Sequence, residues 1–190
     1  MRLILASNSP RRREILQTFG FDLNVIVSDY QEKGRANSPR KTAELYAKNK
    51  AQRVFDELSL SDQQNAVVLG ADTIVVLDNM ILGKPQSVHD AYDMLWALSG
   101  RAHYVYTACA IVTSKKTYIK TAKTKVVFNK LSDEIINNYI ASGSPMDKAG
   151  AYGIQDQEFN LVKKYRGSYY NVMGLPIEKI SPILTRLIKK

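Results

Sequence analysis

The stretch VVLGADTIVVL, residues 67–77, places one carboxylate between two apolar runs that are rich in β-branched residues. Runs of this kind are typical of buried strands. Asp72 lies at their junction, directly after Gly70 and Ala71, which leave space around the backbone. A carboxylate there has to be hydrogen-bonded, bound to a metal or exposed at a cleft, because burying an unpaired charge is costly. Residue type alone fits an Asp in a turn between two strands equally well.

The totals indicate an ordinary soluble globular protein. A chain of 190 residues can build one sizeable core, or two small lobes that share a cleft. No apolar run reaches the roughly 20 residues that cross a bilayer, and the first apolar run is too short for a signal peptide. The single Cys109 lies in an apolar run, which excludes a disulfide framework and a cysteine metal site. We therefore expect a cytoplasmic protein without a membrane partner.

The net charge of +9 is unevenly distributed, because residues 1–95 are balanced and residues 96–190 carry the whole excess. A basic half is compatible with nucleic-acid binding. Much of the excess, however, consists of dispersed lysines without interleaved aromatic residues: Lys115, Lys116, Lys120, Lys123, Lys125 and Lys130. This pattern favours solvated strand faces and turns, so we expect no nucleic-acid partner.

Periodicity, capping residues and turn residues predict a mixed order of strands and helices. Besides the central stretch, strands are expected at residues 2–6, 23–27, 104–112, 118–128 and 159–163. Helices are expected at residues 11–19, 42–58, 88–98, 133–141 and 177–188, with a linker at 59–65, a Gly-rich loop at 146–155 and a turn region at 167–174. We find no repeat and no interdomain linker, so residues 1–190 are expected to form a single α/β domain.

The first predicted helix has an unusual start. Ser9 is in the position of an N-cap and Pro10 in the first helical position. The next residues are the cations Arg11, Arg12 and Arg13. Cations in a first turn oppose the helix dipole, so three of them beside free backbone amides favour a bound phosphate. The alternative is that the arginines extend into solvent or pair with Glu14.

Other loops contribute further charged residues. Lys84 lies between Gly83 and Pro85, and Lys148 lies in the Gly-rich loop. Cations suit a polyphosphate, whereas acids suit a divalent metal or an activated water. Zinc clusters, a Ser-His-Asp arrangement, a P-loop and a dinucleotide fingerprint are all missing from the sequence. Hydrolysis at a nucleotide phosphate by a metal and a carboxylate is therefore the leading chemistry.

Over essentially its whole length the chain resembles the Maf family of nucleoside triphosphate pyrophosphatases. The matching stretches are LASNSPRR (residues 5–12), GADT (70–73), LGKP (82–85), LSG (98–100) followed by His103, DKAGAYGIQ (147–155) and GLP (174–176). Several separate motifs in the same order make this a specific match.

The resemblance implies a cytoplasmic enzyme that cleaves a nucleoside triphosphate to the monophosphate and diphosphate with a divalent cation, Mg²⁺ or Mn²⁺. It also implies a fold like that of the inosine triphosphate pyrophosphatases, with an elongated twisted mixed sheet, flanking helices and two lobes around a central cleft. A homodimer is implied as well. Removal of modified pyrimidine nucleotides is a related role that the family suggests.

The resemblance also assigns roles to individual residues. The catalytic acid of the family falls on Asp72, and the metal-site glutamate on Glu32, which follows Gln31 where the family often has a second acid. The phosphate-binding groups fall on Ser9, Arg12, Arg13, Lys50 and Lys84. The branch of the family that acts on dTTP and UTP carries an arginine, a threonine and a glutamine that fall on Arg11, Thr73 and Gln155. From their positions in the sequence alone, we expect Glu32 to be a surface acid and Lys50 to be a solvated lysine on a helix.

Two other classes of function compete with an enzyme: a binding module for nucleotides or nucleic acid, and a structural regulator of cell division. Asp72 discriminates between them. A protein that only binds phosphate has no need of a carboxylate beside the phosphates, because the negative carboxylate repels the ligand unless a metal lies between them.

Overall fold

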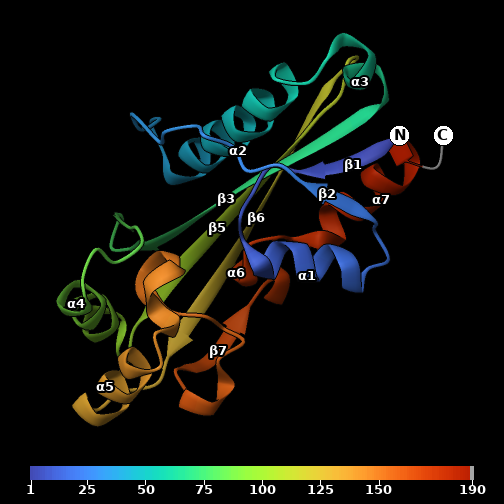
Figure 1. Ribbon diagram of the computed structural model, residues 1–190. Coiled ribbons are helices and arrows are strands. Elements are labelled where there is room, and N and C mark those ends of the chain that lie inside the picture. Colours follow the sequence, from blue (N-terminus) through green and yellow to red (C-terminus); the bar gives the residue numbers. More distant parts are fainter. Residues whose placement is uncertain (189–190) are drawn as a thin grey trace. The chain divides into compact units, whose positions relative to one another are not determined.

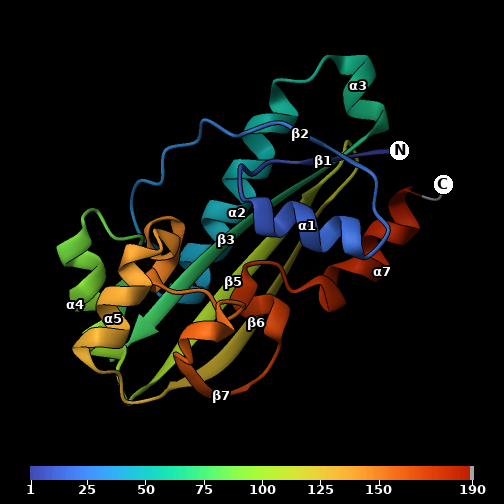
Figure 2. The same ribbon diagram turned by 60° about the horizontal axis from the view of Figure 1, so that its bottom comes forward.

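The computed structural model describes residues 1–188 of the chain, in which strands and helices are interspersed (Figure 1; a second side is shown in Figure 2). The strands are β1 (Arg2–Leu5), β2 (Leu23–Val25), β3 (Ala66–Leu77), β4 (Met80–Leu82), β5 (Ala102–Val112), β6 (Thr117–Phe128) and β7 (Val162–Arg166). The α-helices are α1 (Pro10–Thr18), α2 (Pro39–Asp56), α3 (Leu60–Asn65), α4 (Val88–Leu98), α5 (Asp133–Ala141), α6 (Tyr169–Met173) and α7 (Ile177–Ile188). Three short 3₁₀ turns are η1 (Ser144–Asp147), η2 (Ala149–Ala151) and η3 (Gln157–Phe159).

The strands form a mixed sheet in the order β2-β1-β3-β5-β6-β7, with β4 paired to β3 beside this path. Strand β1 is parallel to both β2 and β3, and its Leu5 lies opposite Leu69. The pairs β3–β4 and β6–β7 are antiparallel. The mixed α/β class expected from the sequence is therefore confirmed.

The chain folds into two compact units. Unit 1 comprises Met1–Asp72, Thr107–Ala122 and the chain from Gly174 onward, and unit 2 comprises Thr73–Tyr106 and Lys123–Met173. The boundaries fall inside β3, β5 and β6, so each of these long strands contributes one part to each unit. The single domain expected for residues 1–190 stays a prediction, and its last two residues lie outside the described part.

In unit 1, helix α2 packs directly against β3 at a glycine (Figure 1). A Cβ on Gly70 would lie 2.4 Å from the carbonyl oxygen of Ala47 and 2.8 Å from the amide nitrogen of Ala51, closer than carbon atoms approach in folded proteins. The sequence therefore requires glycine here, because only a residue without a side chain lets the two backbones approach so closely. This contact brings the next turn of α2 alongside Asp72.

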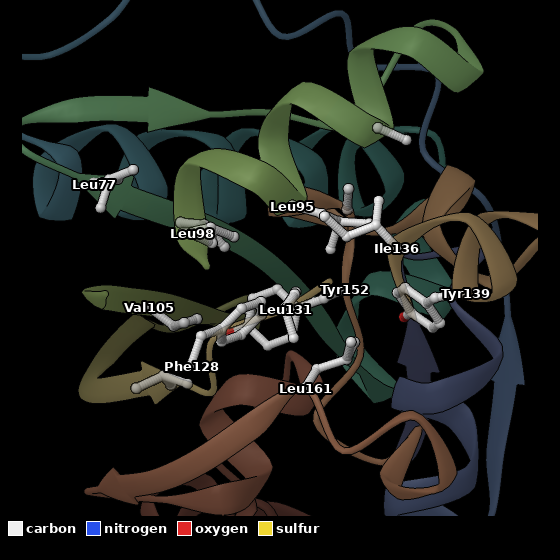
Figure 3. Close-up of a cluster of buried hydrophobic side chains, with 14 residues drawn as sticks. Leu77, Leu95, Leu98, Val105, Phe128, Leu131, Ile136, Tyr139, Tyr152 and Leu161 are labelled. Atoms are coloured by element: carbon white, nitrogen blue, oxygen red, sulfur yellow. The ribbon is translucent and has the colours of Figure 1, made fainter. Parts of the chain in front are cut away.

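In unit 2, a hydrophobic core lies beneath α4 and α5 (Figure 3). Its labelled side chains are Leu77, Leu95, Leu98, Val105, Phe128, Leu131, Ile136, Tyr139, Tyr152 and Leu161. His103 is also buried here, and its ring packs edge-on against Phe128 and Tyr152. A serine caps each of these two helices, since Ser87 accepts from the amide of Asp90 and Ser132 from that of Ile135.

Several sequence expectations are corrected by the structure. The central stretch is one continuous strand, so Asp72 does not lie in a turn between two strands. Residues 59–65 are not a linker, because Ser59 caps the short helix α3. The strand expected at 159–163 begins only at Val162, after η3, and the turn region 167–174 contains helix α6.

Two large apolar residues at the end of α1 and on α2 are exposed. Phe19 follows the last turn of α1 and Leu45 faces outward on α2, with 43% and 37% of their surface exposed. The apolar residues that these two helices bury are Ile15, Leu16, Ala43, Tyr46, Ala47, Ala51, Val54 and Phe55. Within residues 1–188, no helix is both long and apolar enough to span a membrane.

Candidate active site

Asp72 lies within β3, and only 6% of its surface is exposed. The carboxylate accepts a hydrogen bond from the ammonium of Lys50, whose Nζ lies 2.7 Å from Oδ1. Lys50 belongs to α2, one turn beyond Ala47, so the close packing at Gly70 supplies this contact. The carboxylate is therefore buried but paired.

Glu32 shares the same ammonium. Its Oε1 lies 2.6 Å from the Nζ of Lys50, although half of the Glu32 side chain is exposed. Two carboxylates thus converge on one cation: one is buried in the sheet, and the other lies in the polar loop before α2. The structure brings together three predicted site residues that are far apart in the sequence.

The environment of Asp72 changes its proton affinity. Burial raises the pKa of this carboxyl above its ordinary value, and the nearby charge of Glu32 acts in the same direction. Lys50 opposes them through its charge and its hydrogen bond, and Arg12 opposes them more weakly, but the net shift is upward. A carboxylate with a raised pKa is a better proton acceptor, which suits a general base.

The loop that carries Glu32 is held by one face of α2. The hydroxyl of Tyr46 donates to the carbonyl of Gly34 at 2.6 Å, and the guanidinium of Arg53 forms two hydrogen bonds to Asp29 at 2.8 and 3.1 Å. The Arg53 hydrogen bond lowers the pKa of Asp29. Sequence reasoning missed these supports, although their spacing of about two helical turns was a signal for a shared face.

The arginines of α1 do not behave alike. Arg12 donates to the carbonyl of Gly174 at 2.9 Å and to the hydroxyl of Ser7 at 3.0 Å, whereas Arg13 is exposed. Burial lowers the pKa of Arg12, and the charge of Asp72 opposes this shift. Ser9 occupies the N-cap position, but its side chain makes no capping bond, and its amide donates to Ser7 instead. Arg12 is thus a fixed cation in the unit that contains Asp72.

The remaining cation candidates belong to unit 2 and differ in exposure. Lys84 is exposed, while the carbonyl of the preceding Gly83 accepts from the amide of Gly150 at 2.9 Å. The ammonium of Lys148 is buried and donates to the Ser144 carbonyl, the Ser144 hydroxyl and Asp147. An ammonium has three protons, so in this arrangement Lys148 keeps none for a phosphate. Its geometry supports the Gly-rich loop.

The residues assigned to base recognition are placed differently. Arg11, in unit 1, and Thr73, in unit 2, are both half-buried. Gln155, in unit 2, donates from Nε2 to Asp156 at 2.9 Å. Its Oε1 is buried and accepts no hydrogen bond from residues 1–188. Buried amide oxygens nearly always have a partner, so this oxygen is an exception among the described residues.

Asp72 and Glu32 are the carboxylates of this group that could hold a divalent cation. Both approach a single nitrogen, at 2.6 and 2.7 Å, so the two carboxylates already converge on one cation. No cluster of three or more His, Cys, Asp or Glu side chains suited to a metal occurs among the described residues. Two carboxylates fit the way Mg²⁺ is usually held, with substrate phosphates and waters completing its octahedron.

Comparison with known proteins shows the family of this chain. The sequence model of the family described as Maf-like protein matches residues 2–187. A dTTP/UTP pyrophosphatase of Alkaliphilus metalliredigens is 46% identical over 186 residues, which cover 96% of this chain and 94% of the relative. That of Aquifex aeolicus is 44% identical over 187 residues, covering 98% and 96%.

A solved structure is also similar. The Ham1 protein of Staphylococcus aureus superimposes with a TM-score of 0.55 over 98% of this chain and 99% of its own. The two sequences are 14% identical, so this likeness concerns the fold alone.

Proposed function

Because this chain belongs to the Maf family, we propose that it is a nucleoside triphosphate pyrophosphatase that converts dTTP and UTP to the monophosphate and diphosphate. Curated relatives of 41–46% identity over nearly the full chain carry the name dTTP/UTP pyrophosphatase. The observation that carries the proposal is the buried Asp72, whose pKa is raised and which shares Lys50 with Glu32.

In the proposed reaction, Asp72 orients a water molecule and accepts its proton at a carboxylate oxygen as the water attacks the α-phosphorus. The bond from this phosphorus to the bridging oxygen of the β-phosphate breaks, and diphosphate leaves. Lys50 is already beside the carboxylate and offsets its repulsion of the phosphates. Such fixed charges stabilise a transition state without reorganising during the reaction.

Asp72 and Glu32 are the residues that would hold a divalent cation, Mg²⁺ or Mn²⁺. When bound, this ion would neutralise phosphate charge and polarise the α-phosphoryl group. Lys50 holds Oδ1 of Asp72 and Oε1 of Glu32, and the second oxygen of each carboxylate would serve the ion while Lys50 stays in place. Titration calorimetry with Mn²⁺ alone tests this role: Glu32→Gln should weaken the binding of the ion, and unchanged binding would exclude Glu32 as a ligand.

We propose that Ser9, Arg12, Arg13 and Lys84 bind phosphate oxygens, and that Arg11, Thr73 and Gln155 contact the nucleoside. For Arg12 the support is its fixed position within the unit that contains Asp72. For Gln155 the support is its unpaired, buried oxygen. Lys148 is proposed to act through the loop that it stabilises, since its ammonium is saturated.

The remaining proposals concern the setting of the enzyme. We expect it in the cytoplasm as a homodimer, without a nucleic-acid or membrane partner. Sedimentation equilibrium tests the homodimer, and a monomer at micromolar concentration would contradict it.

A screen of nucleoside triphosphates tests the proposed activity. The eight common ribo- and deoxyribonucleotides are incubated with the protein, with and without Mg²⁺ or Mn²⁺, and monophosphate and diphosphate are quantified together. Equal amounts of the two products from dTTP and UTP support the proposal. Release of inorganic phosphate with a nucleoside diphosphate would contradict it, and binding without turnover would favour a binding module.

A further inference from the structure

The carboxamide of Gln155 is held in one orientation by its neighbour Asp156. A carboxylate only accepts hydrogen bonds, so the contact of 2.9 Å between the two side chains requires the amide nitrogen, and not the oxygen, to face Asp156. The opposite face of the carboxamide then carries Oε1. The two ends of Gln155 are thereby distinguished, although they have nearly the same shape.

Asp156 is itself fixed by two further donors. Its Oδ2 accepts from the hydroxyl of Tyr139 at 2.6 Å and from that of Ser144 at 2.7 Å. Tyr139 is fully buried in the core of unit 2, and its hydroxyl also accepts from the amide of Gly153. With Oδ1 on Gln155 and Oδ2 on the two hydroxyls, the carboxylate cannot rotate without losing hydrogen bonds.

The backbone leaves room for this pair of side chains. A Cβ on Gly153 would lie 2.2 Å from Nε2 of Gln155 and 2.7 Å from Oδ2 of Asp156. Glycine at this position therefore lets both side chains fold back over the loop. The same glycine donates its amide to Tyr139, so the loop, the core and the carboxylate form one connected network.

The result of this network is an acceptor without a donor. Oε1 of Gln155 is shielded from solvent and accepts nothing within residues 1–188. Leaving a buried carbonyl unpaired is unfavourable, so a ligand that brings a donor to it binds more tightly. A ligand that brings another acceptor gains nothing and adds repulsion between lone pairs.

We propose that Asp156 is a positioning residue for substrate choice: it presents Oε1 of Gln155 as an acceptor that recognises the N3–H donor of thymine and uracil. The inference rests on the proposed function and deepens it. Cytosine has the same ring size but carries an acceptor at N3, so the fixed carboxamide rejects dCTP. Sites built around a specific hydrogen bond reject mismatched analogues strongly, here by on the order of 100-fold or more.

The test is the ratio of kcat/KM for dTTP to that for dCTP in the variant Asp156→Asn. Asparagine offers a donor as well as an acceptor, so the Gln155 carboxamide can turn and present Nε2 to cytosine. We expect the ratio to fall on the order of tenfold or more. Because it is a ratio within one preparation, it does not change if part of the variant is unfolded.

The matched control is Ser144→Ala, which removes one donor to Asp156 and leaves the carboxylate on Gln155. This variant should keep the wild-type ratio. A wild-type ratio in Asp156→Asn as well would overturn the proposal, and so would a wild-type enzyme that turns over dTTP and dCTP equally. Both results would leave the pyrophosphatase activity standing, whereas wild-type protein that releases no diphosphate from dTTP would refute the proposed function itself.

Discussion

Replacing Lys50 by Met removes the cation that Asp72 and Glu32 share. Glu32 is half exposed, so water can solvate its charge in the variant. Asp72 is 6% exposed and would keep a buried charge without its closest partner. Breaking a buried ion pair by removing one member costs about 3–5 kcal/mol. Because solvent still reaches 17% of the Lys50 side chain, we expect the lower end, a loss of about 3 kcal/mol at pH 7.

The loss of stability in Lys50→Met should become smaller as the pH falls. Without Lys50, the pKa of Asp72 in the folded protein rises further above its ordinary value, because burial is opposed less. The folded state then binds a proton more readily than the unfolded state, so the cost is fully present above the folded pKa and is relieved as the pH falls through it. The difference in the free energy of unfolding between the wild type and Lys50→Met should therefore decrease as the pH falls towards 4.

Urea unfolding of four proteins measures this effect: wild type, Lys50→Met, Asp72→Asn and the double variant. The double variant should recover most of the loss, because its buried charge is gone as well. Lys48→Met is the matched control, since Lys48 is exposed on the same helix. Wild-type stability of Lys50→Met at pH 7, or a double variant no more stable than Lys50→Met, would refute the reasoning.

Further predictions concern the arginine turn and the buried histidine. Arg13→Ala should weaken nucleotide binding and leave thermal stability unchanged. Arg12→Ala should lose turnover and also about 2 kcal/mol of stability, because it removes the hydrogen bonds to Gly174 and Ser7. Equal melting temperatures of the two variants would contradict this prediction. Burial lowers the pKa of His103 from 6.5 to about 4. As the pH falls, the unfolded state therefore binds a proton at this histidine before the folded state does. The free energy of unfolding of the wild type should decrease by about 3 kcal/mol between pH 6.5 and pH 4. His103→Gln should lack this part of the pH dependence in urea unfolding, and an unchanged pH profile would contradict it.

Much of the fold could be predicted from local patterns. The long strands and the capped helices α4 and α5 carry clear periodicity and Ser caps, and they lie where the sequence places them. Helices α3 and α6 were missed because six and five residues are too few to show a helical period. Such short helices depend on tertiary packing more than on their own propensity.

The candidate site shows what local patterns leave out. Asp72 stands out in the sequence because it interrupts an apolar strand. Lys50 and Glu32 look like solvated residues, and only the resemblance to the Maf family singles them out. Lys50 meets Asp72 because Gly70 lets α2 approach β3, a contact between segments about 20 residues apart that periodicity does not encode, and Glu32 joins them through Lys50. The predicted roles of these residues stay predictions until variants are assayed.

Arg12 and Arg13 look equivalent in the sequence but differ in the structure. The helix dipole treats Arg12 and Arg13 as equivalent first-turn cations, and it predicts that removing either would not destabilise the helix. The structure separates them, because Arg12 reaches Gly174, more than 160 residues away, and Arg13 does not. Local electrostatics could not indicate this, since the acceptor belongs to the far end of the chain.

The turnover of Asp72→Asn tests the central claim most directly. The variant removes the charge and the proton acceptor and keeps nearly the same shape, so it should fold. With dTTP and Mg²⁺ we expect kcat to fall on the order of 100-fold or more. The matched control Asp78→Asn changes an exposed turn residue with φ of 47°, which asparagine also adopts, and should keep wild-type turnover. Near wild-type release of diphosphate by folded Asp72→Asn would show that Asp72 is structural and would contradict the proposed mechanism.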